Sequence, residues 1–222
     1  MATQTAAEII RATLPDPDDH PTAADWHAAL GHVPMHRIWF HPLPGTATVE
    51  DALSLAQQKP LVELVNGTIV EKDMGATESR IAAELIIDVG GFVRQRRLGA
   101  IYGADCTLRM PGGNLRLPDV SFIAADRVPP TDVKAPAVCP DLVVEVMSED
   151  NTEAEIRLKL DEFFGGGTRL AWVIDHRRRS VEVHTAAGGR DVVLTEPAAL
   201  DGGEVLPGFV LPLADLFRDV TR

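Results

Sequence analysis

The alternation of apolar and polar positions is most informative in two short runs of the chain. Residues 117–123 are mostly apolar but contain Asp119, and residues 141–148 carry Glu145 in the middle of an apolar stretch. Such runs are typical of strands that are buried on both faces. Because an unpaired buried carboxylate costs on the order of several kcal/mol, each acid requires a partner, most simply a cation.

The rest of the pattern predicts an α/β fold with a central mixed β-sheet flanked by helices. Asn66-Gly67 lies between two β-rich runs, which predicts a hairpin. Apolar positions at helical spacing predict a long helix over 76–97 that stops at Gly99. Thr48 is the expected N-cap of a shorter helix, and Thr152 and Glu155 hold capping-box positions before a helix over 152–164. Further strands are expected at 101–105, 106–110, 170–175 and 180–186, with edge strands and a short helix in 192–217.

The first residues of the chain follow no such pattern. Residues 1–36 are rich in Ala, Asp, His and Pro and show little periodicity, so we expect a loosely attached arm. We predict an N-terminal arm over 1–47 and one folded domain over 48–222. The histidines in and just after this region have no metal-ligand spacing and are expected to be ordinary surface residues.

Composition narrows the class of protein. The net charge of −12 argues against a protein that coats nucleic acid by bulk electrostatics, although it allows a local basic groove. Arg94, Arg96 and Arg97 form one candidate basic patch, and residues 177–179 form another. For both patches, solvated ends of elements are a better explanation than DNA contacts. The two cysteines are too few for a disulfide framework, and no signal peptide or membrane span is evident, so a reducing cytoplasm is expected.

The two acids in the apolar runs suggest a metal site. If their strands are neighbours, Asp119 and Glu145 can converge on one cation, and oxygen ligands favour Mg²⁺ or Mn²⁺. Two helical residues could complete the site. Lys159 borders the apolar stripe of its helix, and Glu78 points along the buried face of the long helix.

Each candidate also has a purely structural interpretation. Lys159 could pair with Glu155 one helical turn away on the surface. Glu78 could be an acid that stabilises a helix N-terminus, and Asp119, after a proline, could be a turn residue. Glu145 is the hardest of the four to explain structurally, because it interrupts an apolar run.

The ordered set of motifs resembles a known family. The matching segments are Leu117–Phe122, Pro140–Ser148, Lys159 four residues before Phe163, Arg169–Asp175, Glu63–Gly67, Tyr102–Asp105, Leu206–Phe209 and Leu211–Phe217. This order is similar to the bacterial putative restriction endonuclease family of the PD-(D/E)XK nuclease superfamily. The resemblance begins near Thr48 and covers about three quarters of the chain.

The resemblance implies a restriction-endonuclease-like core with Asp119, Glu145 and Val146 as metal ligands. The catalytic lysine of the superfamily usually lies two residues after the strand acid, where this chain has Met147. Lys159, on the following helix, would replace it and hydrogen-bond the attacking water. Glu78 resembles the helix acid of other superfamily nucleases and would orient a water or share a second metal.

The function implied is Mg²⁺- or Mn²⁺-dependent hydrolysis of DNA phosphodiester bonds by an enzyme of the cytoplasm. Exposed strand edges favour a homodimer. One alternative is a catalytically inactive nuclease-like scaffold that binds nucleic acid or protein, which the acidic charge and the missing strand lysine favour. Another is an unrelated metal-dependent hydrolase acting on a small phosphorylated substrate.

Overall fold

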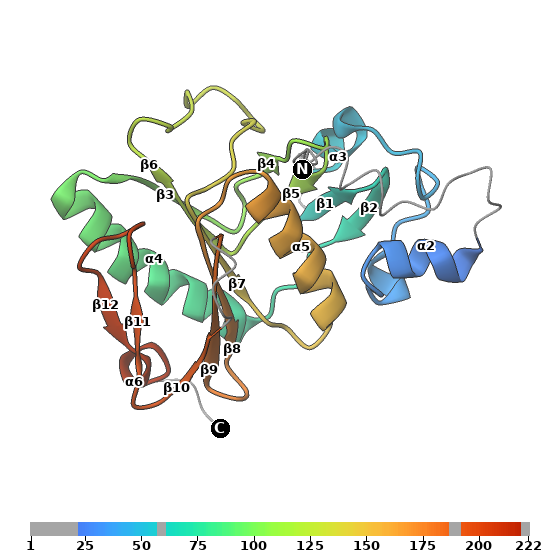
Figure 1. The fold of residues 1–222 in the computed structure, drawn as a ribbon. Helices are drawn as coiled ribbons and strands as arrows, with labels where there is room; N and C mark the ends of the chain where they lie inside the picture. Colours follow the sequence, from blue (N-terminus) through green and yellow to red (C-terminus); the bar gives the residue numbers. More distant parts are fainter. Residues whose placement is uncertain (1–21, 57–60, 187–191, 219–222) are drawn as a thin grey trace, which may run out of the picture.

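A six-stranded mixed sheet forms the centre of the computed structural model, which describes residues 22–56, 61–186 and 192–218 (Figure 1). The strand order is β10-β9-β8-β7-β6-β3. In chain order the strands are β3 Gly99–Gly103, β6 Val120–Ala124, β7 Leu142–Val146, β8 Leu170–Asp175, β9 Ser180–Thr185 and β10 Val192–Thr195. Strands β7 and β8 run parallel, and the other neighbouring pairs are antiparallel. The predicted mixed sheet is therefore confirmed.

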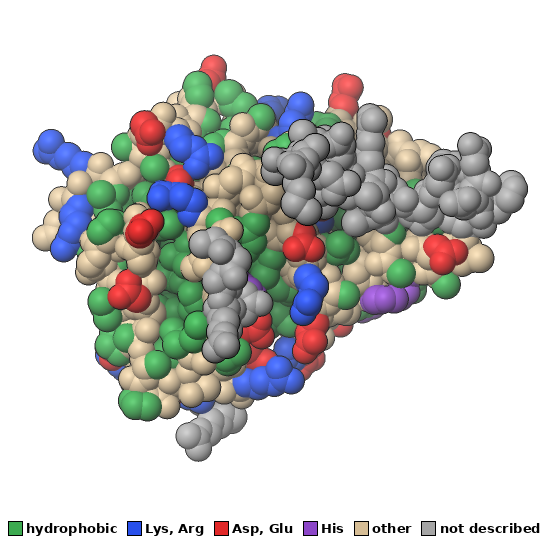
Figure 2. Space-filling model, viewed as in Figure 1, with side chains coloured by type: hydrophobic (Ala, Val, Ile, Leu, Met, Phe, Trp, Pro, Cys, Tyr) green, Lys and Arg blue, Asp and Glu red, His purple; other side chains and the backbone are tan. Residues whose placement is uncertain are grey.

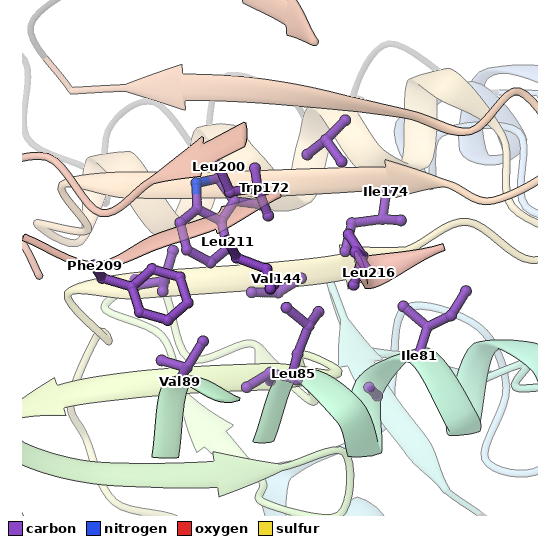
Figure 3. Close-up of a cluster of buried hydrophobic side chains, with 14 of the residues drawn as sticks. Ile81, Leu85, Val89, Val144, Trp172, Ile174, Leu200, Phe209, Leu211 and Leu216 are labelled. Atoms are coloured by element: carbon purple, nitrogen blue, oxygen red, sulfur yellow. The ribbon is translucent and has the colours of Figure 1, made fainter. Parts of the chain in front are cut away.

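The two long helices cover opposite faces of this sheet. Helix α4, Ala76–Arg96, packs on one face, and helix α5, Glu153–Gly165, crosses from β7 to β8 over the other. Figure 3 shows Leu85 and Val89 of α4 directed toward Val144 and Trp172 of the sheet. Because side chains alternate along a strand, Val144 faces α4 while its neighbour Glu145 faces α5.

A smaller sheet lies beside the first, in the order β2-β1-β5-β4. Its strands are β1 Val62–Val65, β2 Thr68–Glu71, β4 Leu108–Arg109 and β5 Leu115–Arg116. The predicted hairpin is confirmed: Val65 pairs with Thr68, and Asn66 and Gly67 have φ values of 51° and 70°, as the tight turn requires. A third pair, β11 Ala199–Asp201 and β12 Val210–Pro212, is followed by the short helix α6 Leu213–Leu216.

The long helix is confirmed, but its predicted stop is wrong. Arg97, with φ at 57°, takes the left-handed position that ends α4. Gly99 is instead the first residue of β3, where a Cβ would lie 2.0 Å from the main-chain oxygen of Ile123. Close approach of two strands, rather than helix termination, is what requires glycine there.

The described part of the N-terminal region is packed against the core, so the expectation of a loosely attached arm is wrong for residues 22–36. It contains α2 Ala23–Ala29 and the 3₁₀ turn Met35–Arg37, and α3 Val49–Ala56 follows. Residues 1–21 lie outside the described part. Apolar side chains of this region join a cluster with the hairpin: Leu30, Val33, Ile38, Val65 and Val70.

An ion pair fastens this region to α5. The Arg37 guanidinium donates to both carboxylate oxygens of Glu155, at 2.8 and 3.0 Å, and both side chains are buried. Thr152 accepts a hydrogen bond from the Glu155 N–H as expected of an N-cap. The Glu155 carboxylate binds Arg37 and Asn151, so half of the predicted capping box forms.

We expect Arg37→Met to lower the free energy of unfolding by about 3–5 kcal/mol, because it leaves the Glu155 carboxylate buried without its ion-pair partner. Urea denaturation followed by circular dichroism measures the change. His36→Ala is the matched control. The exposed His36–Asp150 pair, at 2.9 Å, should contribute less than about 1 kcal/mol. Equal losses in the two variants would contradict this account of the arm.

Candidate active site

Asp119 directly precedes β6, and Glu145 lies in the adjacent strand β7, so the two acids are neighbours as a shared site requires. Strands β6 and β7 pair with Val120 opposite Val144, which puts Asp119 beside the end of β7. The Asp119 N–H donates to the Val144 oxygen at 3.1 Å, and Asp119 Oδ2 accepts from the Val146 N–H at 2.7 Å. Both acids are 3% exposed. Asp119 is thus a fixed, buried carboxylate, and it stands in a bend directly before β6.

Glu145 is a buried carboxylate whose negative charge is only partly balanced by neighbouring groups. Its Oε2 lies 3.3 Å from Lys159 Nζ. Its Oε1 is buried and has no hydrogen-bond partner among the described residues. Burial raises the pKa of Glu145 to about 7; attraction by Lys159 opposes the shift, and the charge of Asp119 adds to it. The negative charge of Glu145 is therefore only partly compensated, and the deficit lies at Oε1.

Lys159 points into the protein and joins two carboxylates. Its Nζ lies 3.2 Å from Glu63 Oε1 as well as 3.3 Å from Glu145 Oε2, and the residue is 2% exposed. Burial acts to lower the pKa of Lys159, but the carboxylates of Glu145, Glu63 and Glu155 outweigh it and raise that pKa. The alternative of a surface pair with Glu155 is wrong, since Glu155 is buried and held by Arg37.

Four further charged residues, which the sequence analysis missed, complete what we call the buried charge cluster. Its members are Glu63, Lys72, Arg116, Asp119, Glu145, Lys159 and Glu162, all buried. Arg116 donates two hydrogen bonds of 2.8 Å to Glu162 and one of 3.0 Å to Glu63. Lys72 Nζ lies 2.7 Å from Asp119 Oδ1. Three cations thus face four carboxylates.

Glu63 is the best compensated of these acids. Its Oε1 accepts from the Leu117 N–H at 3.0 Å, in addition to its ion pairs. Burial acts to raise the pKa of Glu63, but attraction by Lys159, Arg116 and Lys72 outweighs it and lowers that pKa to about 2. Glu63 is therefore ionised at neutral pH, and the surplus negative charge of the cluster falls on the Asp119–Glu145 side.

Part of this cluster had a signal in the sequence. Glu63 interrupts the apolar strand Val62–Val65 in the way that Glu145 interrupts its own strand. Glu155, Lys159 and Glu162 recur at spacings of four and three, so they share one helix face. Lys72 had no such signal, because it lies among polar residues that follow β2.

Glu78 is the predicted site residue that the structure does not bring to the cluster. It lies in the first turn of α4, is buried, and its Oε1 is 2.8 Å from Nε2 of His176. Within the described part of the chain, its hydrogen bond is with His176 rather than with Asp119, Glu145 or Lys159. Its position also fits the alternative of an acid at a helix N-terminus.

The donor set at the cluster fits a hard divalent cation. Across the described ranges, no three His, Cys, Asp or Glu side chains form a metal-binding group, so two carboxylates are the side-chain ligands available. Met147 N–H donates to the Ile174 oxygen on β8, so the main-chain groups of Val146 point the other way, toward Asp119. A cation at this place would have the unpartnered Glu145 Oε1 and the Val146 carbonyl as further oxygen donors. Mg²⁺ accepts such sites because it keeps several waters.

The mixed sheet between two helices, with one acid just before β6 and the other in β7, agrees with the restriction-endonuclease-like core that the resemblance implied. The match of a family model described as "Putative restriction endonuclease" (Uma2) over residues 49–214 shows that the chain belongs to that family.

A solved structure supports the same fold. The crystal structure of a protein from Anabaena variabilis, described as a putative nuclease belonging to DUF820, matches with a TM-score of 0.66 and 21% identity. The match covers 75% of this chain and 97% of that one. Among curated proteins, none matches. In the described ranges, no helix is both long and apolar enough to cross a membrane.

The raised pKa of Glu145 predicts a pH-dependent stability. Because the folded-state pKa, about 7, lies above the ordinary value of 4.5, the stability contributed by the protonated form is complete below about pH 4.5. It is lost as the pH rises through 7, by at most roughly 3 kcal/mol. Glu145→Gln removes this loss, so the variant should gain stability relative to the wild type between pH 5 and pH 8.

Urea denaturation at a series of pH values measures the difference. The exposed Glu50→Gln is the control, whose pH profile should follow the wild type. Parallel profiles for wild type and Glu145→Gln would show that Glu145 carries no such shift.

Proposed function

We propose that this protein is a metal-dependent endonuclease that hydrolyses DNA phosphodiester bonds. Asp119, Glu145 and the main-chain carbonyl of Val146 hold Mg²⁺ or Mn²⁺. The observation that carries the proposal is the buried, unpartnered Oε1 of Glu145 next to the fixed carboxylate of Asp119. Membership of a family described as putative restriction endonucleases supports nucleic acid as the substrate.

The residues of the cluster have distinct roles in this proposal. When bound, the cation lowers the pKa of a coordinated water and neutralises charge on the phosphate. The Val146 N–H orients Asp119. Lys159 binds Oε2 of Glu145 and thereby leaves Oε1 for the metal. Its position between two carboxylates favours this holding role over direct contact with the attacking water.

Glu78 has a separate place in the proposal. His176 directly follows β8, whose parallel neighbour β7 ends at Val146, so the Glu78–His176 pair belongs to the same end of the sheet as the cluster. We assign this pair the orientation of a water at the rim of the site, rather than the binding of the first metal.

The structure also separates the two basic patches. Arg94, Arg96 and Arg97 lie at the C-terminal end of α4, whose 21 residues span roughly 30 Å from the end near Lys72. The turn at residues 177–179 follows β8, and Arg177 donates to the Ser148 oxygen at 2.9 Å, just beyond β7. Figure 2 shows acidic and basic side chains interspersed on the visible face, with no broad basic surface. The turn at 177–179 is therefore the proposed contact for DNA phosphates.

A homodimer in the cytoplasm completes the proposal. Strand β10 is an edge of the central sheet, and its Val192 and Val193 are exposed. Such an edge can pair with a second copy of the chain. Sedimentation equilibrium tests this point: a monomer mass at all concentrations would remove it.

A second candidate function is a non-catalytic scaffold that binds nucleic acid or protein. The observation that favours it is the near-balance of charge in the cluster, where Lys72 and Lys159 already occupy one oxygen of each candidate metal ligand. A scaffold of this kind should show no rise in melting temperature with Mn²⁺, whereas a metal-binding site should show one.

For the nuclease, we expect Glu145→Gln and Asp119→Asn to reduce Mn²⁺-dependent nicking of supercoiled plasmid by at least roughly a hundredfold, because each removes a charged ligand of the cation. Lys159→Met should reduce it as well, through misplacement of Glu145. The control is Glu50→Gln, which should cut at the wild-type rate. Full activity in both the Glu145 and Lys159 variants would rule out this site.

For DNA binding, Arg178→Ala should weaken affinity and lower the slope of log K against log salt by about 1, because it removes one phosphate contact. Arg94→Ala, an exposed arginine at the far end of α4, is the matched control and should leave the slope unchanged. Fluorescence anisotropy with a labelled duplex at several salt concentrations measures both. The opposite ranking of the two variants would place the DNA at the other patch.

A further inference from the structure

Lys72 places an ammonium group on the oxygen of Asp119 that a metal ion would need. One carboxylate oxygen of Asp119, Oδ2, accepts from the Val146 N–H at 2.7 Å. The other, Oδ1, lies 2.7 Å from Lys72 Nζ, and both side chains are 4% exposed. Lys72 Nζ also donates to the main-chain oxygen of Leu117. The ammonium is thus enclosed, with the Leu117 oxygen as its hydrogen-bond acceptor and Asp119 as its ion-pair partner.

The backbone fixes the base of this side chain. The Lys72 N–H donates to the Leu61 oxygen at 2.8 Å, directly after β2. The side chain therefore has a fixed origin, and what can change is the position of its flexible end. Asp119 Oδ1 makes no hydrogen bond of good geometry despite the short distance to Nζ. The ammonium lies against this oxygen as a charge rather than as a well-aligned donor.

Lys159 differs from Lys72 in the oxygen it leaves free. Lys159 binds Oε2 of Glu145, and Oε1 stays without a partner. A divalent cation can therefore approach Glu145 while Lys159 keeps its place. At Asp119 both oxygens already have a neighbour, so an ammonium and a doubly charged ion would compete for the same position and repel each other strongly in a buried environment.

We infer that Lys72 is an internal counter-ion of Asp119 that a divalent metal ion must displace before it can bind. This inference rests on the metal site of the proposed function and concerns what controls occupation of that site. Lys72 is then the residue that weakens metal affinity, in contrast to Asp119 and Glu145, which provide it. Once displaced, its ammonium still has the Leu117 oxygen as a partner.

Mn²⁺ binding measured by isothermal titration calorimetry tests the inference with two variants. Lys72→Met removes the competing charge and should tighten Mn²⁺ binding by at least about tenfold. Lys72→Arg keeps the charge and should bind Mn²⁺ no more tightly than the wild type. Unchanged or weaker binding in Lys72→Met would overturn the inference, because a merely structural lysine would give that result.

A measurement on the unaltered protein guards against misfolding of the variants. Buried, ion-paired ammonium groups give NMR signals that can be followed during titration with diamagnetic Mg²⁺. The Lys72 signal, assigned by its loss in Lys72→Arg, should move on Mg²⁺ binding, and the Lys159 signal should remain. A Lys72 signal that stays in place at saturating Mg²⁺ would overturn the inference.

The same titration distinguishes failure of the Lys72 inference from failure of the proposed metal site. If the wild type binds Mn²⁺ and Lys72→Met binds it equally well, the displacement is wrong and the proposed metal site stands. If neither the wild type nor Lys72→Met binds Mn²⁺, the metal site of the proposed function is itself wrong, and the displacement falls with it.

Discussion

The sharing of one buried ammonium between two carboxylates is the constraint on which this structure depends. Lys159 of α5 lies between Glu63 of the small sheet and Glu145 of the central sheet, so a single charge joins three elements. Buried ion pairs are a poor source of net stability, because desolvation offsets most of the attraction. A packed apolar junction would hold these elements at least as firmly. Net stability therefore does not account for the seven buried charged residues here, which is consistent with the chemical role proposed for them.

The distribution of charge within the cluster supports that view. Glu63 has three cations nearby and a main-chain donor, and its pKa falls to about 2. Glu145 has the same lysine as a neighbour but an orphaned oxygen, and its pKa rises to about 7. Two glutamates that share one ammonium thus differ in what surrounds them. The cluster concentrates its deficit of positive charge at the end of β7, where a cation would relieve it.

The sequence could predict the roles of residues that break a local pattern. It could not predict the roles of residues that depend on a partner far away in the chain. Asp119 and Glu145 stand out because each interrupts an apolar run, and strand alternation then fixes the face on which each lies. Arg37 and Glu155 pair across 118 positions, and Glu78 and His176 across 98. No periodicity connects such residues, so the packed arm and the true partner of Glu78 were missed. Lys72 escaped notice for the same reason, since a lysine in a polar segment looks solvated until the fold buries it.

The cluster is buried, and this burial also prevents a large molecule from reaching it. Asp119 and Glu145 are each 3% exposed, and a phosphodiester cannot reach them without movement of the surrounding chain. Arg37 donates to the main-chain oxygens of Glu71, at the end of β2, and Asp150, between β7 and α5. It therefore connects the end of β2, which is followed by Lys72, to the loop between β7 and α5. The same contacts that attach the N-terminal region to the domain hold these segments in place. In the proposed nuclease, a substrate reaches the two acids only when these segments move.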